Sequence, residues 1–138
     1  MSQTKSGEEI TVFINSPGGD THTALGIYDL LNKSDRIIIG VVSGIAHSGA
    51  SLILQGCKKR IMTTNSRLML HKSTVQVAGS VENTQAALDT FRALDEKYYE
   101  IYAARAGDKA DHIAEMANKD KYFDTSAALA AKLIDEIL

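Results

Sequence analysis

The sequence predicts an α/β fold, on the basis of three observations. Short apolar runs at residues 9–14, 36–42 and 68–71 have the composition of buried strands. Segments with apolar residues at helical spacing, most clearly 21–32 and 81–106, alternate with these runs. A chain of 138 residues is long enough for one domain with its own hydrophobic core. These features indicate layered strands and helices in a single domain that spans the whole chain.

Composition excludes several classes of protein. Hydrophobic residues make up 44% and charged residues 23%, as in an ordinary globular domain. The net charge of −2 gives no electrostatic support for a nucleic-acid or membrane partner. The single cysteine, Cys57, rules out an intramolecular disulfide and a cysteine-based metal site, which favours a reducing compartment. With no signal-peptide core and no run near the roughly 20 apolar residues of a membrane span, we expect a soluble cytoplasmic protein.

The first elements follow from local patterns. Residues 1–8 are polar and are expected to be a disordered lead-in. The strand at 9–14 ends at a tight turn, residues 15–19 (Asn-Ser-Pro-Gly-Gly), whose adjacent glycines permit positive φ. The helix expected at 21–32 places four apolar side chains on one face: Ala24, Ile27, Tyr28 and Leu31.

The second strand, 36–42, leads into a turn of small residues, 43–51, and then a helix to about Gln55. Beyond it we expect short strands at 60–63 and 68–71, followed by an exposed strand or loop at 72–80. The C-terminal elements expected are a short helix at 108–117, a loop at 118–123, a helix at 126–132 capped by Thr125, and a short strand at 133–137.

A long helix is expected at 81–106, before Gly107. Its apolar positions form one stripe: Val81, Thr84, Leu88, Phe91, Leu94, Tyr98 and Tyr102. A helix of this length measures roughly 39 Å, which exceeds the diameter of a small domain. One interpretation is an ordinary core helix. Its length and aromatic end instead favour a helix that projects to meet another subunit.

The turn at 43–51 carries the first candidate for chemistry. Ser48 lies where a buried strand ends and a helix begins, so free backbone N–H groups and the helix dipole favour negative charge there. Gly49 lets a substrate approach the backbone, which suits a nucleophilic serine with an oxyanion site. The pattern is not Gly-x-Ser-x-Gly, because residues 46 and 50 are alanine. On this stretch alone, Ser48 as a simple helix cap is the favoured interpretation.

His71 and Asp120 are candidate partners for Ser48. Taken alone, a histidine ending an apolar strand is more often structural, and a loop aspartate is more often a cap or a solvated charge. However, strand ends in α/β sheets gather at one edge, where sites form. Together the three residues supply a nucleophile, a general base and a group that orients the base.

Four blocks in order resemble the Clp protease proteolytic subunit family, the ClpP-like serine peptidases, and especially its phage and prophage members. The blocks are Phe-Ile-Asn-Ser-Pro-Gly-Gly-Asp at 13–20, Gly-Ile-Ala-His-Ser-Gly-Ala-Ser at 44–51, Asn-Ser-Arg-Leu-Met-Leu-His at 65–71 and Asp-Lys-Tyr-Phe-Asp-Thr-Ser-Ala at 120–127. Leu-Ile-Asp at 133–135 also fits, so the resemblance covers residues 9–138. It implies a ClpP/crotonase-like spiral of β-β-α units, in which 81–106 is the projecting handle helix.

The resemblance also implies a function, serine endopeptidase activity on unfolded or capsid-associated protein. Ser48 would be the nucleophile, His71 the general base and Asp120 the orienting acid, with the backbone N–H groups of Gly19 and Gly49 as oxyanion donors. The segment from Lys72 would help to bind an extended substrate by strand addition. Family members form stacked homo-oligomeric rings fed by an ATP-driven unfoldase. No motif for a metal ion or organic cofactor is present.

Three departures from the family pattern stand out. His47 occupies a position where the family commonly has alanine; outward packing is favoured over a role as a second base or a perturbation of Ser48. Lys72 and Ser73 follow His71, where a proline-containing pair is usual. Few residues precede the strand at 9–14, where the family has a further strand and helix, so the chain is expected to lack that segment. Because the segment makes unfoldase contacts in the family, an unfoldase partner is left open.

Two alternative functions are retained. One is a catalytically inactive ClpP-like ring or scaffold subunit, in which the three residues would not be aligned. The other is a crotonase-type acyl-CoA enzyme, which shares the spiral fold and uses two backbone oxyanion donors. The crotonase interpretation does not explain Ser48, His71 and Asp120 together. Signal peptide peptidases of related fold use a lysine base, and no motif places a lysine here.

Overall fold

The computed structural model describes residues 7–138, so most of the expected lead-in at 1–8 lies outside the described residues. Gly7 and Glu8, which are described, lie against the start of the second strand. The Gly7 N–H donates to the carbonyl oxygen of Asp35 at 3.3 Å, and the Glu8 carboxylate pairs with Arg36 at 3.3 Å.

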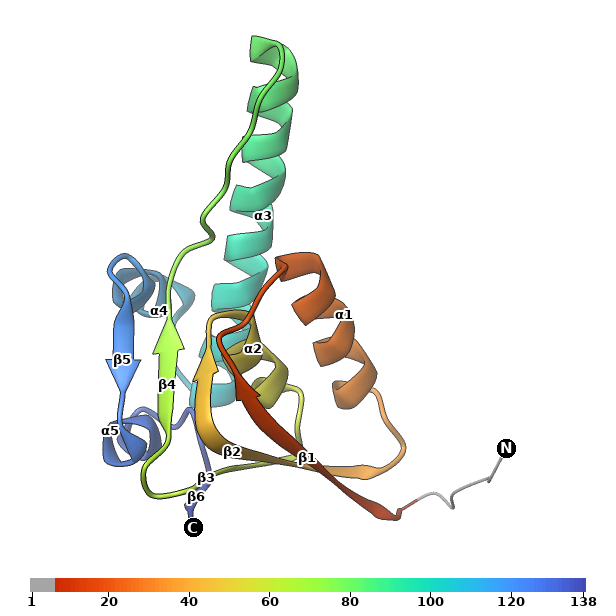
Figure 1. Cartoon of the computed structure of the whole chain (residues 1–138), viewed down its shortest axis with the longest axis vertical. Coiled ribbons are helices and arrows are strands. Elements are labelled where there is room, and N and C mark those ends of the chain that lie inside the picture. Colours follow the sequence, from red (N-terminus) through yellow and green to blue (C-terminus); the bar gives the residue numbers. More distant parts are fainter. Residues whose placement is uncertain (1–6) are drawn as a thin grey trace.

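The described strands form one sheet with β2 at its centre (Figure 1). β2 pairs in parallel with β1, β3 and β4, β3 pairs in parallel with β6, and β4 pairs antiparallel with β5. The strand bounds are β1 Glu9–Ser16, β2 Ile37–His47, β3 Lys59–Met62, β4 Arg67–Leu70, β5 Lys121–Phe123 and β6 Glu136–Ile137.

The central strand changes partners along its length. Its first half pairs with β1 and β3, and its last residues, Ile45 to His47, pair with Arg67 to Met69 of β4. The sequence-based expectation that the strand ends at Val42 was therefore wrong. The small residues at 43–47 favour a turn in the sequence, but the strand continues because residues 45–47 pair with β4 and the N–H groups of Gly44 and Ile45 donate to Ser66 Oγ and Asn15 Oδ1. The turn itself is confined to Ser48.

Five helices complete the described fold: α1 Thr21–Asn32, α2 Gly49–Gln55, α3 Val81–Ala106, α4 Ala110–Ala117 and α5 Thr125–Ala130. The Asp20 side chain caps α1 by accepting from the Thr23 N–H, and Ser80 caps α3 by accepting from the Asn83 N–H. α3 ends at Gly107, whose left-handed conformation is the usual helix stop. The bounds expected for α1 and α3 match those observed.

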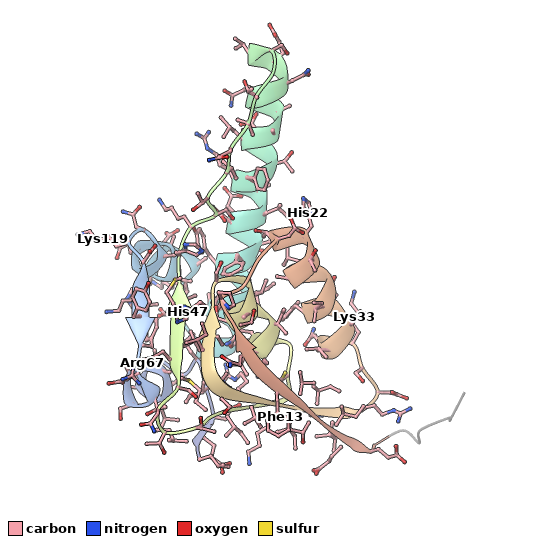
Figure 2. The ribbon with its side chains drawn as sticks, viewed as in Figure 1. Phe13, His22, Lys33, His47, Arg67 and Lys119 are labelled. Carbon is pink, nitrogen blue, oxygen red and sulfur yellow. The ribbon has the colours of Figure 1, made fainter. Side chains whose placement is uncertain are left out.

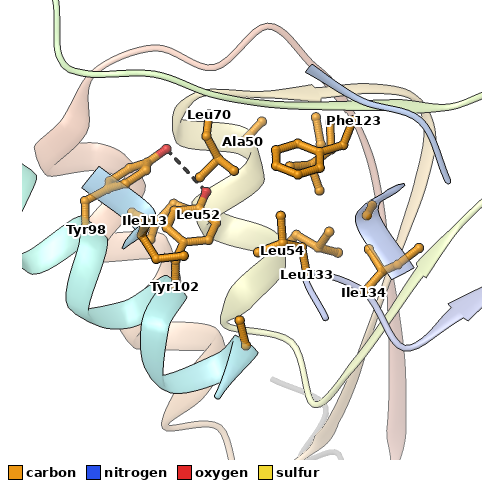
Figure 3. Packing of buried hydrophobic residues seen from close by; sticks show 14 of the residues in the cluster. Ala50, Leu52, Leu54, Leu70, Tyr98, Tyr102, Ile113, Phe123, Leu133 and Ile134 are labelled. Atoms are coloured by element: carbon orange, nitrogen blue, oxygen red, sulfur yellow. Dashed lines mark hydrogen bonds between the residues drawn. The ribbon is translucent and has the colours of Figure 1, made fainter. Parts of the chain in front are cut away.

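The core surrounds α2, which packs against β2, α1 and α3 (Figure 3). Side chains from nearly every layer meet there. The fully buried ones include Leu52 and Leu54 of α2, Val42, Leu68, Leu70, Tyr102, Ile113 and Leu133. Each buried aliphatic side chain stabilises the fold by roughly 1.5–3 kcal/mol, so α2 is held firmly in place.

α3 extends well beyond the rest of the fold, and the irregular segment after β4 runs up beside it (Figure 1). Its buried residues are all in the lower half: Tyr98, Tyr99, Tyr102, Ala103 and Ala106. At the upper end Val81 is 80% exposed. The projection expected for this helix is present, and 72–80 is a loop rather than a strand.

The C-terminal third differs from expectation in three places. Residues expected to form a loop include the three-residue strand β5, which is too short for its alternation to be recognised in sequence. Asp124, not Thr125, caps α5, because its carboxylate accepts from the Ala127 N–H at 2.8 Å while Thr125 is buried. The last strand is limited to Glu136–Ile137, since Leu133 and Ile134 fill the core instead.

An ion pair between the buried Arg60 and the half-buried Asp135 ties the C-terminal segment to β3. The Arg60 guanidinium, whose side chain is 4% exposed, donates to both carboxylate oxygens of Asp135 and to Gln55 Oε1. Burial alone would raise the pKa of the Asp135 carboxyl, but the hydrogen bonds and charge of Arg60 outweigh it and hold that pKa below its usual value. This pair lies away from Ser48, so it supports the fold rather than the site.

Candidate active site

Ser48 occupies the single-residue turn between β2 and α2. Its φ is 54° and its ψ is −124°, and its side chain makes no capping hydrogen bond. The Oγ atom lies instead 2.7 Å from Nε2 of His71. Among the described residues only Ser48 and Lys132 combine a side chain with a positive φ. Such a conformation costs of order 1–3 kcal/mol and persists only where the surroundings hold it.

Contacts on both sides hold this conformation. The Ser48 N–H donates to the carbonyl oxygen of Met69 in β4 at 2.8 Å. The Ser48 carbonyl accepts from the N–H groups of Ser51 and Leu52, from the Ser51 hydroxyl at 2.6 Å, and from the Tyr98 hydroxyl. The backbone around Ser48 is therefore fixed by β4 on one side and by α2 and α3 on the other.

His71 follows β4 directly, so the bond between Ser48 and Met69 also sets its distance from Ser48. Its other ring nitrogen, Nδ1, lies 3.6 Å from Oδ1 of Asp120. Asp120 immediately precedes β5, and the antiparallel pairing of β5 with β4 brings it to His71. The structure thus brings together the three residues proposed from sequence, although the His71–Asp120 separation exceeds a good hydrogen bond.

The turn before α1 lies against Ser48. A Cβ atom at Gly18, whose φ is 92°, would lie 2.5 Å from the His47 carbonyl oxygen, so only glycine fits there. The Gly18 N–H donates to Ser16 Oγ at 3.1 Å. In contrast, the N–H groups of Gly19 and Gly49 have no acceptor among the described residues. Two free donors beside the serine can hold a negatively charged oxygen.

Two hollows adjoin these atoms. One, of about 290 Å³, contains both Ser48 and His71; its lining is Pro17, Gly18, Gly19, Ser48, His71, Ser73 and Thr74. The other, of about 200 Å³, adjoins the two free N–H groups and has one aliphatic and one polar side; its lining is Ser16, Gly18, Gly19, Asp20, Thr23, Ala24, Ile27, Gly49, Ala50 and Ile53. The arrangement can receive an extended chain with one side chain in the second hollow.

His47 is the last residue of β2 (Figure 2), and Ser48 follows it in the chain. Its ring contacts Tyr122 edge-to-face with centroids 5.5 Å apart, and its Nε2 atom is buried with no partner among the described residues. Burial lowers the pKa of His47, and the nearby charge of His71 lowers it further. A neutral ring packed on Tyr122 agrees with the packing role favoured for it.

Cys57 offers no competing nucleophile. It is 1% exposed, and burial raises the pKa of its thiol to about 11, so the thiolate is scarce at neutral pH. No group of three His, Cys, Asp or Glu side chains within 7–138 is arranged to hold a metal ion. In the same part of the chain no helix has both the length and the apolar character needed to cross a bilayer.

Sequence reasoning missed two sets of contacts. The hydroxyl groups of Ser51, Tyr98 and Tyr102 form a buried network behind Ser48. The tyrosines were assigned only to an apolar stripe, and a tyrosine in such a stripe gives no sign of where its hydroxyl points. Ser73, in the unusual pair after His71, donates its hydroxyl to Asp95 of α3 at 2.6 Å.

Residues 1–138 match the family model described as Clp protease. The chain belongs to the Clp protease family. The mixed α/β sheet with its long α3 is consistent with that family's fold, and the membership expected from the sequence blocks is confirmed.

Individual relatives support the same assignment. The chain is 29% identical to ATP-dependent Clp protease proteolytic subunit 3 of Rhodococcus jostii, over 94% of this chain and 65% of the relative. Chloroplastic subunit 6 of Arabidopsis thaliana is 30% identical, over 94% of this chain and 49% of the relative. Subunit 1 of Rhodopirellula baltica is 33% identical, over 95% and 59%. The chain thus spans about half to two thirds of the length of the relatives it matches.

Proposed function

We propose that this member of the Clp protease family is a serine endopeptidase whose triad is Ser48, His71 and Asp120. The observation that carries the proposal is the 2.7 Å contact between Ser48 Oγ and His71 Nε2, made by a serine in a strained turn. Nucleophile and base within hydrogen-bond reach, with a third group behind the base, is the arrangement that activates a serine.

Each group would have one role in peptide hydrolysis. Ser48 Oγ attacks the peptide carbonyl while His71 Nε2 takes its proton, and the N–H groups of Gly19 and Gly49 bind the oxyanion. His71 then protonates the leaving amine, and water repeats the sequence to release the acyl group. Asp120 orients the imidazole; its 3.6 Å separation is in keeping with catalytic hydrogen bonds that tighten only when substrate binds.

The substrate class we propose is an extended polypeptide, from unfolded or capsid-associated protein. Its backbone would lie between the turn at 16–19 and the segment that starts at Lys72, which line one hollow with Ser48. The side chain before the scissile bond would enter the second hollow. Because Ala24, Ile27 and Ile53 line that hollow together with the Asp20 carboxylate and Thr23, small side chains without negative charge are expected to fit best.

Assembly into homo-oligomeric rings is part of the proposal. In the upper half of α3, Val81 is 80% exposed and Leu88 and Phe91 are only partly buried, and a neighbouring copy would cover them. The relatives compared above are named as subunits of an ATP-dependent protease, so an ATP-driven unfoldase is the partner class to test.

The direct test is labelling by a fluorophosphonate probe, located by mass spectrometry. We expect label on Ser48 in the native chain and none in Ser48→Ala, with strong loss in His71→Ala. Ser126→Ala, an exposed serine on α5, is the matched control and should label normally. A folded, ring-sized particle that does not label at Ser48 would contradict the peptidase proposal.

A second candidate is an inactive ring or scaffold subunit. The feature that favours it is the exposure of Asp120, whose side chain is 61% accessible and not in hydrogen-bond contact with His71. The labelling experiment separates the two, because a scaffold subunit would assemble without modifying Ser48.

A further inference from the structure

The carbonyl group of Ser48 and the N–H group of Gly49 belong to the same peptide unit. That unit is planar, so its C=O and N–H point in opposite directions and turn together. Whatever fixes the Ser48 carbonyl therefore also aims the Gly49 N–H. This coupling matters because the Gly49 N–H has no partner of its own among the described residues.

The peptide unit needs an external anchor. Ser48 has a positive φ, so relaxation of its backbone would rotate the following peptide. Gly49 has no Cβ to resist that rotation. The Ser48 carbonyl also receives the N–H groups of Ser51 and Leu52, at 3.0 and 3.3 Å, and the Ser51 hydroxyl at 2.6 Å, but all three come from the first turn of the same short helix.

The anchor from another element is Tyr98. Its hydroxyl, carried on α3, donates to the Ser48 carbonyl oxygen, and the residue is only 5% exposed. Tyr98 is the sole described residue outside α2 that donates to this carbonyl. An anchor from a helix of 26 residues resists rotation of the peptide better than the neighbouring turn can.

We propose that Tyr98 is a positioning residue: its hydroxyl holds the Ser48–Gly49 peptide so that the Gly49 N–H faces the oxyanion. This inference rests on the proposed peptidase function, which it deepens by assigning the orientation of the oxyanion site to a side chain on α3.

The surroundings of Tyr98 keep its hydroxyl in the donating role. Tyr102, fully buried one turn along α3, lies with its hydroxyl 3.4 Å from that of Tyr98 (Figure 3). The Tyr102 hydroxyl also bonds Ser51 Oγ, which itself donates to the Ser48 carbonyl. Burial raises the pKa of Tyr98, so the phenol stays protonated throughout the pH range of catalysis.

The test is Tyr98→Phe in the full chain, with Tyr99→Phe as the matched control. Tyr99 is the adjacent buried tyrosine, and its hydroxyl has no partner among the described residues. Rates are expressed per serine titrated with fluorophosphonate, which corrects for any misfolded fraction. The measurements are kcat and KM for a fluorogenic peptide and the affinity for a peptide aldehyde, whose adduct with serine places an oxyanion in the site.

For Tyr98→Phe we expect kcat to fall about 10- to 100-fold, somewhat less than outright loss of an oxyanion donor. Aldehyde affinity should weaken by the same factor while KM stays within about twofold. Tyr99→Phe should match the native chain in all three. A merely structural role for Tyr98 would change the titrated fraction but leave kcat and aldehyde affinity per site unchanged, and that result would overturn the inference.

Tyr98→Met, which keeps much of the volume without the hydroxyl, serves as a second variant and must behave like Tyr98→Phe. If neither variant folds, Tyr98 is assigned to stability and the inference fails. If the native chain itself neither labels at Ser48 nor cleaves peptide, both the proposed function and this inference are wrong. A native chain that is active beside a fully active Tyr98→Phe overturns the inference alone.

Discussion

The two ends of the proposed triad are supported very differently. Ser48 lies in a turn whose backbone is bonded to β4, α2 and α3, beside a glycine that tolerates no side chain. Asp120 is 61% exposed and is brought to His71 by a strand of three residues. The nucleophile must keep a strained conformation, whereas the acid only orients a ring, so the fold supports them unequally.

The largest effect on activity is expected when the side chains of His71 and Asp120 are removed one at a time. We expect His71→Ala to lower kcat by about 10⁶-fold and Asp120→Ala by about 10⁴-fold, because an unoriented base still functions in part. The measurement is peptide hydrolysis per mole of folded protein. Equal losses of kcat would mean that catalysis depends on Asp120 as strongly as on His71, which would contradict the weaker support proposed for the acid.

A variant remote from both ends separates loss of fold from loss of site. Asp135→Ala leaves the buried Arg60 guanidinium with only Gln55 as a partner, and because the Asp135 side chain is 39% exposed, unfolding free energy should fall by about 1.5–3 kcal/mol in urea titrations. Hydrolysis per folded molecule should hardly change. If activity falls by more than the decrease in folded protein explains, the Arg60–Asp135 pair must also affect the active site.

The same pair has a defined pH dependence. Because the folded pKa of Asp135 lies below its usual value of 3.8, its contribution to stability is complete above about pH 4 and is lost as pH falls through the folded pKa. Acid titrations of the native chain and Asp135→Ala should therefore converge at low pH. Curves that stay parallel down to pH 2 would contradict this assignment.

A substitution in the turn that packs against Ser48 should disturb the position of the nucleophile. Gly18→Ala would place a Cβ 2.5 Å from the His47 carbonyl oxygen, displacing the turn and lowering kcat by about 100-fold. Gly26→Ala, in α1, is the matched control, since a Cβ there meets nothing within 4 Å and the residue lines neither hollow. It should lose less than about threefold. Similar losses in both would show that the turn does not position the site sterically.

The smallest effect is expected on the acid side. Asp124→Ala removes the cap of α5, which follows β5 directly, and should cost about 1 kcal/mol of stability. Thermal unfolding measures this, with Ser126→Ala as a control that leaves the cap intact. If the acid end is the weaker one, the activity of Asp124→Ala should decline at lower temperature than its near-ultraviolet circular dichroism. Coincident declines would contradict that view.

Sequence predicted most of the fold, and it failed where pairing or packing overrides local composition. The apolar run at 9–14 and the helical spacing of apolar residues at 21–32 and 81–106 located β1, α1 and α3. The continuation of β2 to His47 depends on β4, which no local pattern announces. β5 has too few residues for any period to be recognised.

The candidate site divides along similar lines. Ser48, His71 and Asp120 were located from family blocks, since single residues in turns and at strand ends carry little signal alone. Their spatial approach depends on two strand pairings, β2 with β4 and β4 with β5. The hydroxyl of Tyr98 could not have been placed, because helical spacing indicates which face of α3 is buried but not which atom it meets.

The short pairing of β5 with β4 determines how peptidase activity should be lost on heating. Three residue pairs hold β5 at the sheet edge, and small edge units open at lower free energy than the whole domain. Each such opening would carry Asp120 away from His71 while the core around α2 stays intact. Peptidase activity should therefore decrease reversibly some degrees below the melting temperature, because a growing fraction of folded molecules has Asp120 separated from His71.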